Sequence, residues 1–511
     1  MATEIRDRAS AIDTDTPFDR DRLETVVDGC PVRLGDLSRA SMAESEAFAR
    51  RIVEKGDKVY GWTTGFGPLV AHDVARTDTA TLQKRLLAHL ATGTGPPLPV
   101  RDVRALMTAR LGTLALGASA ARPAVADQLA AALNRGLTPV VPSQGTVGAS
   151  GDLTPLAHLA LVLSGEGEAW IEDERMPAAR ALARYGLEPL DLQGRDGLAL
   201  VNGTDAMTGI AALNGGAAQR AQAIAILHAA LYTRVMGGTD RAFDDRLGVV
   251  RPHPGQMHVH HMLTTMLQDP TGKWSTQEPL QDAYTLRCAP QVLGAVQDQL
   301  DAHDRTVDIE LRSVTDNPVF LPREDAVLHG GNFQGQHIAF ASDTLTNAVI
   351  KIAELAERRV ARLTDRTLNN GLPPFLTDGT AGLDSGFMGA QVTASALIAE
   401  MRTRAIPASV QSVPTNANNQ DIVSMGTIAA RKASDTLTDC YRILAIEAMA
   451  LTQAVELRTG SLPVSGQNRP LAAWCHEVRA RSRHLSEDRA LSAEIETLAA
   501  AFRGAAVKPF G

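Results

Sequence analysis

The chain has 511 residues and a formal net charge of −8, and its charged residues are spread along the sequence without a basic stripe. This balance excludes strong electrostatic binding to nucleic acid or to an anionic membrane, and it favours an enzyme that acts on small molecules. The first 20 residues contain no apolar core of a signal peptide, and no later run approaches the roughly 20 apolar residues of a membrane span. We therefore expect a cytoplasmic protein without membrane or nucleic-acid partners.

The length would allow three domains, yet neither a Pro/Ser-rich nor a charged linker separates them. The sequence thus predicts a single unit over residues 1–511. The segment His258-Val259-His260-His261 lacks the Glu, Asp or Cys partners of a known metal site, so no metal is expected. The cysteines are far apart and form no C-x-x-C pair, which predicts reduced structural thiols. They are Cys30, Cys288, Cys440 and Cys475.

Polar helices and turns are predicted for residues 1 to about 55. The loop at 59–68 follows, in which three glycines and a proline surround aromatic residues, a composition typical of a segment that opens and closes. Taken alone, Tyr60 would be a residue that anchors this loop through the packing of its side chain. The pattern of residues 81–92 predicts a helix with leucines on one side. A lone histidine among them, His89, would ordinarily be a core residue whose ring nitrogens are hydrogen-bonded.

The glycine-rich stretch GTVGASGDLTPLAH occupies residues 145–158. At its centre, the Gly151 amide nitrogen can approach the Ala149 carbonyl because neither residue is bulky, and Ser150 can then lose water to leave an exocyclic methylene. The alternative is an ordinary turn before a helix capped by Ser150 or Asp152. A serine-hydrolase elbow does not fit, because Asp152 stands where G-x-S-x-G requires its last glycine.

Residues 153–163 are apolar almost throughout and stop at Ser164-Gly165, which predicts a buried helix with a glycine C-cap. The positive N-terminal end of this helix would point at the Ala149-Ser150-Gly151 loop and stabilise negative charge there. Further along, Asn202 follows an apolar run and precedes a glycine, as a turn residue or a helix cap would.

Long helices are predicted for the second half of the chain. Apolar residues recur at helical spacing from Val292 to Leu311 and again over residues 342–365. About 25 such residues would span roughly 37 Å, which suggests a central bundle. Tyr284 and Arg287 are three positions apart, so a helical turn would place the phenol and the guanidinium on one face. Residues 329–335 and 414–421 are predicted to be polar loops.

The motif at 145–158 closely resembles the signature of the aromatic amino acid ammonia-lyases, which include histidine, phenylalanine and tyrosine lyases and related aminomutases. The separate motifs follow the family's order from about Tyr60 to beyond Met425. This resemblance implies that Ala149, Ser150 and Gly151 become a 4-methylideneimidazol-5-one (MIO) group, with no metal or soluble coenzyme. It implies a mainly α fold, with a lid-loop region at about 1–140 and the prosthetic-group loop and helical bundle at about 141–511. It also implies a homotetramer in which each active site draws on three chains.

The resemblance also implies a role for each candidate residue. Tyr60 is the catalytic base, while Asn202 and Tyr284 organise the prosthetic group and the substrate amine. Arg287 is a bidentate clamp for the substrate carboxylate, and Asn332 assists it. The remaining substrate-binding residues are Gly67, His89, Leu90, Phe333, Asn416, Asn419 and Gln420.

Two positions indicate tyrosine as the substrate. His89-Leu90 is the pair seen in bacterial tyrosine lyases, whereas phenylalanine lyases carry an aromatic residue before the leucine and histidine lyases carry Ser-His. Histidine lyases also have glutamate where Gln420 stands. We therefore predict a carbon–nitrogen lyase that converts L-tyrosine into trans-p-coumarate and ammonia. A histidine or phenylalanine lyase, a tyrosine 2,3-aminomutase and a catalytically silent helical binding protein remain alternatives.

Overall fold

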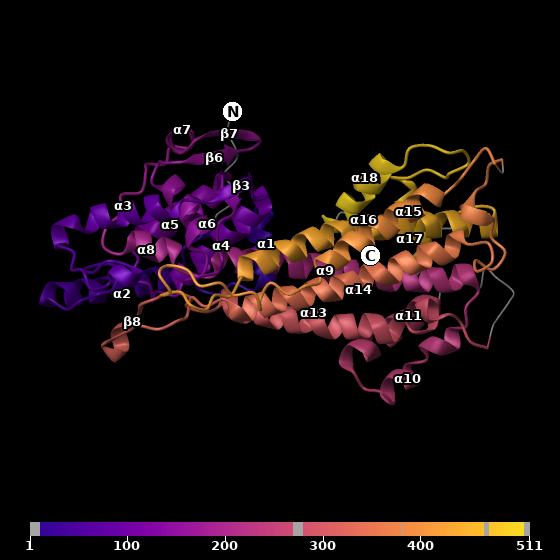
Figure 1. Ribbon diagram of the computed structural model, residues 1–511, viewed down its shortest axis with the longest axis horizontal. Coiled ribbons are helices and arrows are strands. Elements are labelled where there is room, and N and C mark those ends of the chain that lie inside the picture. The colour runs from indigo at the N-terminus through magenta and orange to yellow at the C-terminus, as the bar shows by residue number, and fades with distance from the viewer. Residues whose placement is uncertain (1–10, 269–279, 381, 464–469, 505–511) are drawn as a thin grey trace. The chain divides into compact units, whose positions relative to one another are not determined.

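The computed structural model in Figure 1 describes residues 11–268, 280–380, 382–463 and 470–504. These residues form eighteen α-helices and nine strands of at most four residues each. The predicted mainly α fold is therefore confirmed. Within the described ranges, we find no helix with both the length and the apolar character needed to cross a membrane.

Two compact units make up the chain, and three segments contribute to each. Unit 1 comprises residues 1–214, 304–343 and 407–431, and unit 2 comprises residues 215–303, 344–406 and 432–511. The single unit over residues 1–511, with a division near residue 140, stays a prediction.

Unit 1 contains the N-terminal helices, drawn from indigo to magenta in Figure 1. These are α1 Arg20–Val27, α2 Asp36–Lys55, α3 Thr79–Leu90, α4 Val100–Ala115, α5 Pro123–Asn134, α6 Leu153–Leu163, α7 Ala178–Arg184 and α8 Asp196–Val201. Short 3₁₀ turns lie at η2 Gly67–Leu69, η3 Arg76–Asp78 and η5 Pro322–Glu324.

The strands of unit 1 form four small sheets. β1 Ile12–Asp13 runs parallel to β2 Val32–Arg33, and the other pairings are antiparallel. β3 Thr94–Pro97 pairs with β5 Pro142–Gln144, and β8 Val319–Leu321 pairs with β9 Ala326–Leu328. The remaining sheet has three strands in the order β4 Leu137–Pro139, β6 Glu168–Ile171 and β7 Glu174–Pro177. Such short sheets fix loops and contribute little of the core.

Helix α6 has the bounds that its sequence predicts. It is apolar almost all round, and Leu156, Leu159 and Leu163 are fully buried in the main core of unit 1. The helix stops at Ser164, and the following Gly165 has a φ of +88°, a conformation that suits glycine because it has no Cβ. The predicted buried helix with a glycine stop is therefore confirmed.

Unit 2 is a bundle around one large core. Four helices of 23 to 34 residues contain residues of both units and are labelled in Figure 1: α9 Asp205–Met236, α13 Ala289–Leu311, α14 Gln336–Thr364 and α16 Gly426–Thr459. The shorter elements are η4 Asp240–Phe243, α10 Asp245–Val249, α11 Pro254–Leu267, α12 Tyr284–Arg287, η6 Pro374–Leu376, α15 Met388–Thr403, α17 Pro470–Arg479 and α18 Ser492–Arg503. The predicted long helices are thus present, and α14 begins six residues before the predicted start.

Candidate active site

A cavity of about 930 Å³ in unit 1 brings together most of the predicted site residues. Its lining comes from the loop after α2, from α3, from the loop before α6 and the start of α6, and from α8 and the residue after it. Three later loops complete the lining, at Asn317, at 330–333 and at 415–420. The predicted residues in the lining are Tyr60, Gly67, His89, Leu90, Ala149, Ser150, Asn202, Phe333, Asn416, Asn419 and Gln420. Residues far apart in the sequence therefore share one small-molecule-sized space.

The Ala149-Ser150-Gly151 loop is packed so closely that position 151 accepts only glycine. Gly151 has a φ of +76°, and a Cβ placed on it would lie 2.0 Å from the carbonyl oxygen of Gly203. The same carbonyl accepts a hydrogen bond of 2.7 Å from the amide of Asp152. The loop is thus clamped against the turn that joins α8 and α9.

The opposite side of the loop rests on the residues before α16. Val147 and Ala149 pack against an apolar cluster that includes Val423 and Met425, and the Met425 amide donates to the Val147 carbonyl at 2.9 Å. Position 148 is also tight, since a Cβ on Gly148 would lie 2.3 Å from the Ser424 hydroxyl. The loop is held on both sides, and its three central residues carry the small side chains that an internal cyclisation needs.

Asp152 is fully buried directly after this loop. It occupies the N-cap position of α6 without capping the helix, because its carboxylate accepts from the Met207 amide at 2.7 Å and from the Thr427 hydroxyl. Burial raises the pKa of Asp152 to about 7. A buried carboxyl group with a raised pKa therefore lies beside the Ala149-Ser150-Gly151 loop, and Asp152 is not the ordinary helix cap of the alternative interpretation.

Tyr60 lines the cavity from the loop at 59–68. Its phenol oxygen accepts a hydrogen bond of 2.9 Å from the Gly67 amide, and its ring meets Phe66 edge-on at 6.2 Å between centroids. A donated hydrogen bond stabilises negative charge on a phenol oxygen. Gly67 has a φ of +52°, and a Cβ there would lie 2.7 Å from Asn416 Nδ2. The loop at 59–68 thus reaches the loop at 414–421.

His89 is exposed at the end of α3 and is not a core histidine. Its Nδ1 lies 3.2 Å from the Arg85 carbonyl oxygen, which can only accept, so Nδ1 carries the proton of this bond. In the neutral ring, Nε2 is then an acceptor. Leu86 and Leu90 line the same cavity and offer apolar contact. Together these three side chains suit an aromatic ring that carries a hydroxyl group.

Gln420 lies next to the serine of the loop. The Thr415 hydroxyl donates to Gln420 Oε1 at 2.7 Å, and Gln420 Nε2 donates to Ser150 Oγ at 3.4 Å. The intervening turn is unusual, because Asn416, Ala417 and Asn418 all have φ values between +52° and +62°. Asparagine tolerates this left-handed conformation better than most residues, so the sequence of the turn suits its shape.

Four predicted residues are not among those that line the cavity: Gly151, which lies directly behind the lining residue Ser150 in the chain, and three residues outside this loop. Asn332 is exposed, and its amide nitrogen donates to the Val314 carbonyl at 3.1 Å. Tyr284 and Arg287 belong to unit 2, where the guanidinium carbon lies 4.7 Å from the centroid of the tyrosine ring. The predicted shared face of these two side chains is confirmed.

Several lining residues were not singled out by the sequence interpretation. Phe66 stands in the predicted loop, and Leu86 in the predicted helix, so both were within reach of the local pattern. Asn317 and Thr415 had only their turn-rich surroundings as a signal. The other unpredicted lining residues include Val147, Leu153 and Leu198.

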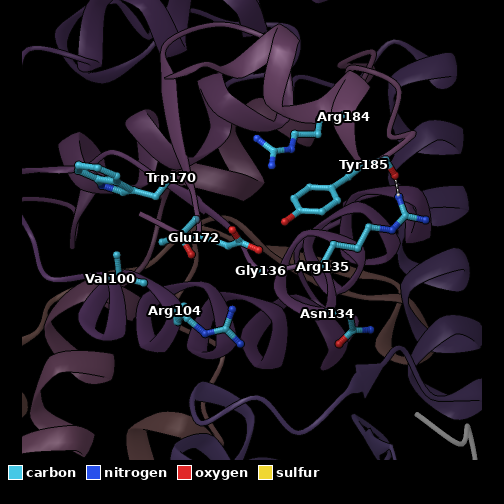
Figure 2. Close-up of a pocket in the computed structure, with 10 residues that line it drawn as sticks. Val100, Arg104, Asn134, Arg135, Gly136, Trp170, Glu172, Arg184 and Tyr185 are labelled. Atoms are coloured by element: carbon cyan, nitrogen blue, oxygen red, sulfur yellow. Dashed lines mark hydrogen bonds between the residues drawn. The ribbon is translucent and has the colours of Figure 1, made fainter. Parts of the chain in front are cut away.

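A second cavity in unit 1, of about 640 Å³, contains none of the predicted residues (Figure 2). Arg104 and Arg184 approach it from opposite sides of the view, with Glu172 between them. Arg104 donates to the carbonyls of Val26, Val27 and Leu133, so it serves the ends of α1 and α5. Arg104 therefore has a structural role at the edge of this cavity.

Comparison with known proteins agrees with this geometry. Residues 19–480 match the family model described as aromatic amino acid lyase. A tyrosine ammonia-lyase of Cereibacter sphaeroides is 46% identical over 507 residues, which cover 96% of this chain and 97% of that protein. A histidine ammonia-lyase of Gloeobacter violaceus is 44% identical over 92% of this chain and 90% of that protein.

Solved structures give the same result for the fold. A tyrosine aminomutase from Streptomyces globisporus superposes with a TM-score of 0.91 at 37% identity, over 97% of both chains. The family model, the two relatives and the solved structure all agree with the family that the motif at 145–158 resembles. The chain therefore belongs to the aromatic amino acid lyase family, a family of carbon–nitrogen lyases.

Proposed function

We propose that this protein removes ammonia from L-tyrosine and releases trans-p-coumarate. The observation that carries the proposal is the position of His89, which lines the cavity that also contains the Ala149-Ser150-Gly151 loop and whose Nε2 is an acceptor in the neutral ring. A buried phenol needs a hydrogen-bond partner, and this nitrogen supplies one. The similarity to the tyrosine ammonia-lyase of Cereibacter sphaeroides supports the same substrate.

The Ala149-Ser150-Gly151 loop fits an MIO group made from these three residues. The fit rests on the close approach of Gly151 to Gly203 and on the small side chains at 149 and 150. Once formed, the group supplies an electrophilic methylene that makes the amino nitrogen a better leaving group. Asn202 and Gln420 flank this position and orient the nitrogen of the substrate. No metal or soluble coenzyme is part of the proposal.

Tyr60 acts as the base in this proposal. The deprotonated phenol oxygen takes the β-hydrogen of the substrate as a proton while the carbon–nitrogen bond breaks, and the two electrons of the C–H bond form the double bond. The Gly67 amide holds the phenol oxygen in place and stabilises its charge. Phe66 packs edge-on against the ring and restricts its rotation.

We further propose a homotetramer that completes the site. Tyr284 is 71% exposed in the single chain, and the neighbouring Arg287 has a guanidinium suited to a bidentate grip on a carboxylate. In the proposed assembly, these two residues of one subunit serve the cavity of another. Asn332, Phe333, Asn416 and Asn419 would complete the contacts to the carboxylate and the ring.

Two observations favour other activities of the same family, namely a histidine ammonia-lyase or a tyrosine aminomutase. A histidine ammonia-lyase is 44% identical, and a tyrosine aminomutase superposes with a TM-score of 0.91. Gln420 argues against histidine, because its neutral amide gives no charge to hold an imidazolium. An aminomutase would return ammonia to the β-carbon, so its product from tyrosine would be β-tyrosine.

Product analysis tests the proposal. The purified protein is incubated separately with tyrosine, phenylalanine and histidine, and each product is identified by chromatography. We expect p-coumarate as the main product, and an intact chain about 36 Da lighter than its sequence because cyclisation loses two waters. Ser150→Ala is the control and should show neither the mass loss nor turnover. An active wild-type protein with an unmodified mass would refute the proposed prosthetic group.

A further inference from the structure

The side-chain amide of Asn202 has only one possible orientation in this structure. Its Nδ2 lies 2.8 Å from Asp316 Oδ1 and 2.8 Å from the Asn317 carbonyl oxygen. Both atoms accept hydrogen bonds, so the amide nitrogen must face them. Rotating the amide by 180° would place its oxygen against two other oxygens. The oxygen of Asn202 is therefore the part of the amide that remains for a ligand.

Asp316 is itself held rigidly. Arg195 donates from Nη1 to Asp316 Oδ2 and from Nη2 to Asp316 Oδ1, both at 2.7 Å, and both side chains are 0% exposed. The Asn317 amide adds a hydrogen bond of 2.6 Å to Asp316 Oδ1. A bidentate arginine–carboxylate pair of this kind fixes both partners in one plane. Asp316 thus presents one fixed acceptor to Asn202.

The backbone of Asn202 is anchored from the other side. The buried Arg110 donates from Nη1 to the Asn202 carbonyl at 3.1 Å, and it forms an ion pair with Asp205 at 2.6 Å. Asn202 is 4% exposed and lines the cavity that contains the Ala149-Ser150-Gly151 loop. Two buried arginine–aspartate pairs therefore hold one asparagine at the wall of the cavity.

We propose that Asp316, fixed by Arg195, is a positioning residue that keeps the Asn202 oxygen available to accept a hydrogen bond from the amino group of the substrate. The inference rests on the proposed function and adds two residues, Asp316 and Arg195, to those that control it. An amino group offers N–H donors and needs acceptors around it. A flipped Asn202 would instead present an N–H group to those donors, and the contact would be repulsive.

This role predicts a selective effect on ligands. The amino acid substrate carries the amino group, whereas its propenoate product has the same ring and carboxylate without nitrogen. Loss of the fixed Asn202 orientation should therefore weaken use of the amino acid and leave binding of the product unchanged. A purely structural role for Asp316 would weaken both, because it would distort the cavity as a whole.

The test compares Asp316→Asn with Asp196→Asn. In Asp316→Asn the side chain keeps its size, but its amide can present either an N–H group or an oxygen to Asn202. Of the two acceptors, only the Asn317 carbonyl then stays fixed, so the orientation of Asn202 is held less firmly. Asp196 is a matched control, since it is also 0% exposed in its side chain and accepts from Arg122 Nε at 2.7 Å, and it does not line the cavity. Both changes remove one buried carboxylate that is paired with an arginine.

Three quantities are measured for the wild type and both variants: the intact mass, the kcat/KM of the amino acid that the enzyme deaminates, and the inhibition constant of its propenoate product. For Asp316→Asn we expect the wild-type mass, an unchanged inhibition constant and a kcat/KM lower by roughly tenfold to a hundredfold, the range for a lost hydrogen bond to a charged group. Asp196→Asn should change none of the three.

The inference is overturned if Asp316→Asn raises the inhibition constant of the product as much as it lowers kcat/KM, or if Asp196→Asn reproduces the same pattern. If Asp316→Asn does not fold, Arg195→Lys replaces it, because lysine keeps the charge and cannot make the bidentate pair. The same selective loss is then expected, and an equal effect on substrate and product overturns the inference. A wild-type protein that deaminates none of the amino acids would refute the proposed function itself.

Discussion

Replacing Gly151 by alanine tests the packing of the prosthetic-group loop. The new Cβ would lie 2.0 Å from the Gly203 carbonyl oxygen and 2.4 Å from its carbon. Gly203 cannot easily withdraw, because its carbonyl accepts from the Asp152 amide and its own Cβ position faces Arg110 Nη1 at 2.2 Å. Since real Cβ contacts stay above 3.0 Å, the two segments would have to separate by about 1 Å.

Two penalties add up in this variant. A non-glycine residue at a φ of +76° costs about 1–2 kcal/mol in the folded state. Forcing a methyl group into a packed site costs about 1–3 kcal/mol more. Gly136→Ala isolates the first penalty, because Gly136 has a φ of +73° and a Cβ there would meet nothing within 4 Å. Gly151→Ala should therefore lower the free energy of unfolding by more than Gly136→Ala does.

The assay combines chemical unfolding with intact mass spectrometry. We expect Gly136→Ala to keep the mass loss of about 36 Da and nearly wild-type turnover. Gly151→Ala should lose both, because the displaced loop no longer brings the amide nitrogen of residue 151 to the Ala149 carbonyl. The reasoning is refuted if Gly151→Ala shows the full mass loss and unfolds at the same denaturant concentration as Gly136→Ala.

Three further predictions concern the base, the ring pocket and the buried carboxylate. Tyr60→Phe should lower kcat by at least ~10²-fold while the mass loss persists, because the ring remains and the oxygen that accepts the proton is gone. Near-normal turnover of this variant would mean that another residue is the base, with Tyr284 the first candidate. His89→Phe should shift the ratio of kcat/KM for tyrosine over phenylalanine by roughly 10²- to 10³-fold towards phenylalanine, and an unchanged ratio would contradict our substrate assignment. Asp152 has its pKa raised from 3.8 to about 7, so its folded state holds a proton that the unfolded chain releases. The wild type should therefore lose about 3 kcal/mol of stability relative to Asp152→Asn between pH 4 and pH 7, measured by unfolding at several pH values, and parallel curves would exclude this shift.

The sequence by itself determined those features that depend on local patterns. The apolar run at 153–163 and the glycine after it specify helix α6, because an all-apolar helix must be buried and glycine readily adopts a positive φ. The spacing of Tyr284 and Arg287 specifies their contact in α12, since residues three apart share a helical face. The small residues at 149–151 indicate the chemistry of the loop in the same way. Each of these inferences needs only neighbours along the chain.

Only the tertiary structure decided which contacts form between segments that are far apart in the sequence. The sequence shows Asn202 as a turn residue or cap, and its amide orientation depends on Asp316 and Arg195, whose partnership no local pattern reveals. Likewise, the sequence offered a helix cap as the alternative role of Asp152, whereas in the structure its buried carboxylate accepts hydrogen bonds from Met207 and Thr427. Hydrogen-bond direction and burial are properties of the packed neighbourhood, because each depends on which groups folding brings within about 3 Å. That is why a chemistry for the loop could be proposed from the sequence, whereas the contacts around the loop could not.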